Sequence, residues 1–141
     1  MANVLSTTGK LYLLKGASTQ IDWANDTIKL ALTTSSYTPS AAHDFFNDVT
    51  NEISGTGYTA GGAALASKTM TNVSTTAVLD AADVSWTTAT ITNARYGVLY
   101  KDTGTAATSP IIGVFDFGAD QSVSSGTFTV VFSANGCYRI S

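Results

Sequence analysis

Two apolar runs decide the fold of this chain: Arg95-Tyr96-Gly97-Val98-Leu99-Tyr100-Lys101 and Ile111-Ile112-Gly113-Val114-Phe115-Asp116-Phe117. Successive side chains of a strand point to opposite faces. In the first run neither face is polar, which is typical of a central strand covered on both sides. In the second run one face is predicted to hold Ile111, Gly113, Phe115 and Phe117. The polar residues between the runs include a Gly and a Pro, so the two runs are predicted to pair antiparallel as a hairpin at the centre of a sheet.

Further strands are predicted around this hairpin wherever short alternating runs are separated by turn residues. They cover residues 27–32, 64–71 and 126–132, with a short pairing at 137–140. Residues 78–86 are also predicted to be extended, with a turn at Asp80-Ala81-Ala82-Asp83. A short helix is predicted from Ser40 through about Val49. The pattern is typical of a mainly β chain, an antiparallel β-sandwich or barrel with one or two short helices. The large side chains expected in its core are Trp86, Tyr96, Leu99, Phe115, Phe128 and Phe132.

The chain has 141 residues, the length of one domain. We predict that residues 17–141 form a single β-rich domain and that residues 1–16 form an N-terminal arm or short helix, with helix favoured from about Thr7 to Lys15. A single helical stripe can bury only part of the apolar surface of this segment. The segment is therefore predicted to be held by a neighbouring chain, through Leu5, Leu11, Tyr12, Leu13 and Leu14.

Composition argues against several classes of partner. The net charge is −3, the pI is near 4.7 and no Lys/Arg cluster occurs, so nucleic-acid binding is not expected. No apolar run approaches the ~20 residues of a membrane span, and no signal peptide is recognisable, so we expect a chain that is made and used without export. One Cys and one His exclude an internal disulfide and a His/Cys zinc cluster, and no cofactor is predicted.

Charged residues make up 12% of the chain, about half the usual share. Two explanations remain open: partners cover much of the surface, or the surface is a Thr-rich β surface.

Asp102-Thr103-Gly104 resembles the aspartic-protease signature, in which two such Asp residues share a proton. Lys101 precedes it where that pattern needs an apolar residue, and the sequence contains no second Asp-Thr-Gly. We interpret it as a turn between two strands. His43-Asp44 lacks a nucleophile motif, and His43 is predicted to face solvent.

Four aromatic side chains raise a second possible function. Trp23, Tyr58, Trp86 and Tyr96 could stack on sugar rings, as in a carbohydrate-binding β-sandwich module. Burial in the core is the more common position for each of them.

Two segments resemble a family of small structural proteins from the virions of tailed bacteriophages: residues 21–32, Ile21-Asp22-Trp23-Ala24-Asn25-Asp26-Thr27-Ile28-Lys29-Leu30-Ala31-Leu32, and residues 96–104. The Phe45-Phe46 segment and the closing Phe132-Ser133-Ala134-Asn135-Gly136 occur in the expected order. The resemblance covers most of the chain, and its motifs are structural.

This resemblance implies a non-enzymatic protein of the virion, assembled in the host cytoplasm. Within the family the chain looks most like a capsid decoration (cement) protein, which binds the major capsid protein on the outer shell. A homo-oligomer, with a trimer as the working hypothesis, is the expected state. A neck, tail or fibre component of the same virion is the alternative.

Overall fold

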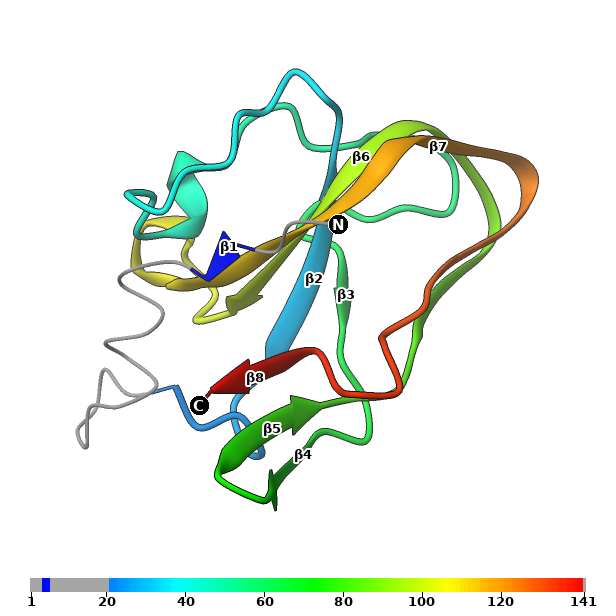
Figure 1. Cartoon of the computed structure of the whole chain (residues 1–141). Helices are drawn as coiled ribbons and strands as arrows, with labels where there is room; N and C mark the ends of the chain where they lie inside the picture. The colour runs from blue at the N-terminus through cyan, green and yellow to red at the C-terminus, as the bar shows by residue number, and fades with distance from the viewer. Residues whose placement is uncertain (1–3, 6–20, 141) are drawn as a thin grey trace.

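The computed structural model describes residues 4–5 and 21–140, and these residues form two antiparallel sheets with almost no helix (Figure 1). The strands are β1 (Val4–Leu5), β2 (Ile28–Thr33), β3 (Ala63–Ala64), β4 (Thr69–Val73), β5 (Thr76–Asp80), β6 (Val84–Lys101), β7 (Ile111–Val130) and β8 (Tyr138–Ile140). Two single 3-10 turns are η1 (Phe46–Asp48) and η2 (Ala106–Thr108). The larger sheet has the order β1-β7-β6-β2-β3 and the smaller β4-β5-β8. The predicted mainly β, sandwich-like fold is confirmed, and the sheets do not close into a barrel.

The predicted hairpin is the centre of the larger sheet, since β6 pairs antiparallel with β7. Between Leu99 and Tyr100 of β6 the pairing skips Ile112, which is an extra residue on β7. An extra residue reverses the alternation of side chains beyond it. The prediction that Ile111 shares a face with Phe115 is therefore wrong, and these two side chains pack in different apolar clusters.

The two segments predicted as separate strands at 111–117 and 126–132 belong largely to one long strand, β7. The register between β6 and β7 shifts four more times between Trp86 and Tyr96. Ser125 of β7 has a φ of 48°, and Gly126 follows it. Because irregular pairing bends and twists a ribbon, β6 and β7 form a long arc rather than a flat hairpin (Figure 1).

β2 lies beside β6 along its whole length and confirms the strand predicted there. Ile28, Leu30 and Leu32 are buried in the main core, as predicted. Ala31 on the opposite face is also fully buried. β2 is therefore covered on both faces.

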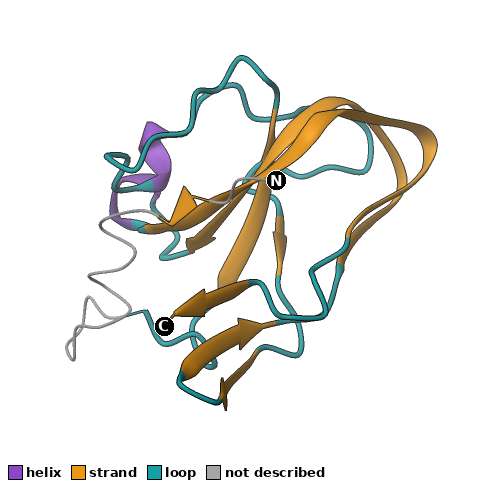
Figure 2. Cartoon of the chain, in the orientation of Figure 1, coloured by secondary structure: helices purple, strands orange, loops and turns teal. Residues whose placement is uncertain are grey.

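The smaller sheet lies against one end of the larger sheet (Figure 2). β5 pairs with β4 on one side and with β8 on the other, so the predicted C-terminal pairing is confirmed. The apolar side chains between the sheets form the main core, which includes Trp86, Leu99, Phe115, Phe128 and Phe132, as predicted. Tyr96 is the exception.

Tyr96 packs half-buried on a second, smaller cluster with Tyr37, Val98 and Val114. The prediction that it lies in the main core is wrong because the alternation along β6 places it on the same face as Val98, opposite Leu99.

The helix predicted from Ser40 to Val49 is also wrong, since only one 3-10 turn, η1, forms there. The segment is held by tertiary contacts instead. The Phe46 ring stacks on the Tyr100 ring with centroids 4.0 Å apart, and Phe45 forms a β-bridge with Pro110. These contacts favour an extended path over a regular helix.

The glycine-rich segment 55–62 is a tight loop that approaches other backbone closely. A Cβ on Gly62 would lie 1.9 Å from the Leu30 carbonyl oxygen. The loop is fixed by Glu52, whose Oε1 accepts hydrogen bonds from the Tyr58 hydroxyl (2.7 Å) and the Gly61 N–H (2.6 Å). The Tyr58 hydroxyl also accepts from the β2 backbone, so the loop is tied to the larger sheet.

β1 pairs with β7 of the same chain, with Val4 opposite Val114 and Leu5 opposite Gly113. The backbone of these two residues is held by the chain's own sheet, where the sequence predicts a neighbouring chain. The helix predicted from Thr7 to Lys15 lies outside the described residues.

Candidate binding surfaces

A groove opens where β7 bends, and it has a cavity volume of about 460 Å³. Its lining consists of Phe115, Phe117, residues 121–123, residues 127–133, Gly136 and Cys137. The bend at Ser125 and Gly126 separates the two lining stretches of β7. The groove therefore exists because one strand curves around it.

The lining of this groove carries no charged side chain among the described residues. Its floor is aromatic, with Phe115, Phe128 and Phe132 all buried. Burial, with the nearby Asp80 carboxylate as the next cause, raises the pKa of the Cys137 thiol to about 12. Cys137 therefore stays a neutral thiol and adds no charge, so the groove suits an uncharged, apolar ligand.

The strand that supplies most of this groove, β7, has an edge that is largely unpaired in the described part of the chain. All its lining residues come from β7 and the connection after it, and none from β6. Among residues 4–5 and 21–140, the side of β7 away from β6 pairs only with β1, at Gly113 and Val114. Beyond Val114 the backbone of β7 therefore offers hydrogen-bonding groups beside the apolar groove, the combination that binds an added strand.

A second surface is the outer edge of β4. All five residues of β4 are exposed, and β4 pairs with β5 in an unbroken register. Met70 is 62% exposed and Val73 is 52% exposed. Edge strands are usually protected by charges, Pro or bulges, and β4 has none of these.

Of the five residues predicted to bind a partner, one belongs to the described part of the chain. Leu5 lies on β1, and its backbone pairs with Gly113. Leu11, Tyr12, Leu13 and Leu14 lie outside the described residues, so their role stays a prediction.

Comparisons with protein families, with curated proteins and with solved structures found no match.

The Asp102-Thr103-Gly104 segment is a turn, as predicted. The Asp102 carboxylate contacts Lys29 Nζ at 2.7 Å and accepts a hydrogen bond from the Gly104 N–H at 2.9 Å. The Lys29 ammonium, with that N–H, holds the pKa of Asp102 below its usual range. Asp102 is thus a charged group that anchors the hairpin loop to β2.

His43 is half-buried rather than facing solvent, and its Nδ1 lies 2.9 Å from the Tyr37 hydroxyl. Among the described residues no group of three or more His, Cys, Asp or Glu side chains is placed to hold a metal ion. No helix in that part of the chain is long and apolar enough to cross a membrane.

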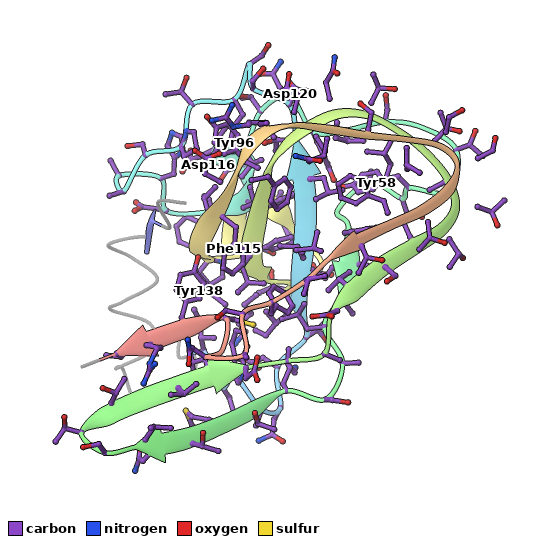
Figure 3. All side chains as sticks on the ribbon, turned by 45° about the vertical axis from the view of Figure 1, so that its right-hand side comes forward. Tyr58, Tyr96, Phe115, Asp116, Asp120 and Tyr138 are labelled. Atoms are coloured by element: carbon purple, nitrogen blue, oxygen red, sulfur yellow. The ribbon has the colours of Figure 1, made fainter. Side chains whose placement is uncertain are left out.

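Two of the four aromatic residues considered for sugar stacking are buried. Trp23 donates its indole N–H to the Asp80 carbonyl, and Trp86 packs against Phe128. Tyr58 points into the arc of β6 and β7, near Trp86 (Figure 3). These positions leave no flat aromatic platform among the three.

Sequence reasoning missed the groove and the β4 edge, although a signal for both is present. The sequence has no charged residue from Gln121 through Tyr138 and none from Thr69 through Leu79. These are long uncharged stretches for a surface, and each supplies one of the two surfaces.

Proposed function

We propose that this chain is a non-enzymatic structural protein of a tailed-bacteriophage virion, a capsid decoration protein that binds the major capsid protein on the outer shell and stabilises it. The proposal joins the sequence resemblance to the binding surfaces. It needs binding alone, without a reaction.

The two segments that carry the resemblance are neighbours in the fold. β2, from the first segment, pairs with residues 96–101 of the second, from Ile28 opposite Lys101 to Thr33 opposite Tyr96. The resemblance therefore concerns one continuous piece of the central sheet, whose register must be kept for the rest of the chain to fold around it.

The observation that carries the proposal is the uncharged groove beside the open edge of β7. Such a surface suits an extended segment of another protein, because the backbone edge binds by hydrogen bonds and the aromatic floor accepts apolar side chains. On a shell, each bound copy that also contacts a neighbouring site gains from effective concentration. Weak single contacts then stabilise the whole particle.

The test compares particles with and without this protein for heat and osmotic resistance, together with a density map that locates the chain. Particles lacking the protein are expected to assemble but to open at lower temperature or under milder osmotic shock. Adding back the purified protein is expected to restore resistance, and adding heat-unfolded protein is the control.

Two results contradict the proposal. Unchanged resistance of the depleted particles, with density at the neck, tail or fibres, would place the protein elsewhere on the virion. Specific binding on a glycan array, with no copy on the particle, would support the carbohydrate-binding alternative.

A further inference from the structure

We propose that copies of this chain bind one another head to tail: β4 of one copy adds to the open edge of β7 in the next copy, with Met70 over the groove. The proposal concerns the isolated protein. The proposed function places an extended capsid segment in the same groove, so β4 of a neighbouring copy and that segment would compete for it.

The exposed apolar side chains point to these two surfaces. In the described part of the chain the large hydrophobic residues that remain exposed are Met70, Val73 and Val131. The first two lie on β4 and the third, 72% exposed, lines the groove. Placing β4 so that Met70 faces the groove would cover Met70 and Val131 together. Val73, three residues from Met70 on an unbroken strand, faces the opposite side of β4.

The charges of the two surfaces match a second copy. The described residues that line the groove carry no charge, so a charged occupant would lose its hydration without gaining an ionic partner from them. β4, Thr-Met-Thr-Asn-Val, is uncharged along its whole length. A flexible Met side chain also adapts well to an aromatic floor, where sulfur–ring contacts are favourable.

The backbone geometry supports the same pairing. β4 is extended and regular over five residues, and its partner β5 occupies only one of its two edges. Beyond Val114, the edge of β7 away from β6 has no strand partner among the described residues. Adding β4 to this edge joins the smaller sheet of one copy to the larger sheet of the next, and satisfies backbone groups on both strands.

The two surfaces are different, so the contact is heterologous, and repeated contacts form a closed ring or an open chain. A single added strand of five residues covers less area than the ~1,200 Å² of standard stable complexes. A ring gives each copy two such contacts. This is the arrangement by which the predicted homo-oligomer can form.

The test uses two charge variants, Met70→Lys on β4 and Val131→Glu on the groove, both at exposed positions. Self-association is measured by sedimentation velocity, and folding is checked by thermal melting. For each variant alone the Kd of self-association is expected to rise by at least about tenfold, because the introduced charge meets an uncharged partner surface. Mixing the two variants is expected to restore association, because the unaltered β4 of the Val131→Glu copy then meets the unaltered groove of the Met70→Lys copy. In the reverse contact the introduced Lys meets the introduced Glu.

The matched control is Thr92→Lys, which adds the same charge at an exposed position of β6 and should associate as the wild type does. Four results overturn the proposal. The first is a wild-type protein that stays monomeric at its highest soluble concentration. The second is self-association that Val131→Glu retains and Met70→Lys loses, which would indicate that β4 pairs with β4. The third is self-association retained by both variants, and the fourth is a mixture of the two variants that fails to associate.

Discussion

The ring of Phe115 stacks on the ring of Tyr138, with centroids 5.1 Å apart and an interplanar angle of 24° (Figure 3). Phe115 belongs to β7 of the larger sheet and Tyr138 to β8 of the smaller sheet, so this contact joins the two sheets. Phe115 also contacts Phe132, and it forms part of the floor of the groove. The packing that holds the sheets together thus also shapes the candidate binding surface.

Phe115→Ala is expected to lower the free energy of unfolding by about 3–5 kcal/mol, because it removes a buried ring and leaves a cavity between the sheets. Denaturant unfolding followed by far-UV circular dichroism measures this loss. Phe128→Ala should cost a similar amount from the same core, whereas Val131→Ala, at an exposed position, should change stability little. A wild-type midpoint for Phe115→Ala would contradict the assigned packing.

Tyr138→Phe is expected to leave stability unchanged or raise it by about 1 kcal/mol. The Tyr138 hydroxyl is buried and has no hydrogen-bond partner in the described part of the chain. Tyr138→Phe therefore removes the free-energy cost of burying this hydroxyl without a hydrogen bond. Tyr37→Phe is the matched control, because the buried Tyr37 hydroxyl is hydrogen-bonded to His43 and its loss should destabilise the fold. Equal losses for both variants would show that the Tyr138 hydroxyl has a partner.

Gly62→Ala should destabilise the protein more than Gly104→Ala. Both glycines have positive φ, 78° and 87°, so both substitutions carry the backbone strain of about 1 kcal/mol. At Gly62 the new methyl group would also meet the Leu30 carbonyl oxygen, whereas nothing lies within 4 Å at Gly104. Thermal melting of the two variants separates strain from steric clash, and equal melting temperatures would contradict the close approach of the 55–62 loop to β2.

Asp102→Asn should destabilise the protein at neutral pH by up to about 1 kcal/mol, the usual limit for a partly exposed ion pair. Lys29 lowers the pKa of Asp102 in the folded chain, so the folded state binds the proton less readily than the unfolded state. Its contribution is therefore complete above the unfolded-state pKa and is lost as the pH falls through the folded-state pKa.

The difference in unfolding free energy between wild type and Asp102→Asn should accordingly shrink in acid. Urea unfolding at neutral pH and near pH 3 measures it, with Asp120→Asn, at an exposed position of β7, as the control. A difference that grows in acid would contradict the Lys29–Asp102 pair.

Deletion of residues 1–16 should leave the β domain folded, because β1 contributes only two register pairs to the larger sheet. Binding to the particle, or to a second copy, should weaken if Leu11, Tyr12, Leu13 and Leu14 contact a partner. Circular dichroism reports the fold, and cosedimentation with depleted particles reports binding. Loss of folding would place this segment in the domain's own core instead.

The sequence by itself determined the central strands of this protein. The apolar alternation at Ile28, Leu30 and Leu32, and again at Phe128 and Val130, predicts which side chains are buried. It does so because burial of apolar surface is the dominant favourable term in folding. Turn residues such as Asp102 and Gly104 fixed where the chain reverses, because their backbone preferences are local. These features needed no knowledge of distant contacts.

Only the tertiary structure decided the register and the binding surfaces. Ile112 became a bulge because β7 pairs with a specific partner strand, and a polar stretch such as residues 118–125 could join β7 because backbone pairing does not require apolar side chains. The Phe46 ring stacks on the Tyr100 ring, and the segment forms a single 3-10 turn instead of the predicted helix. The groove and the open strand edges arise from residues far apart in the sequence, whose pairing depends on the closure of long loops rather than on local pattern.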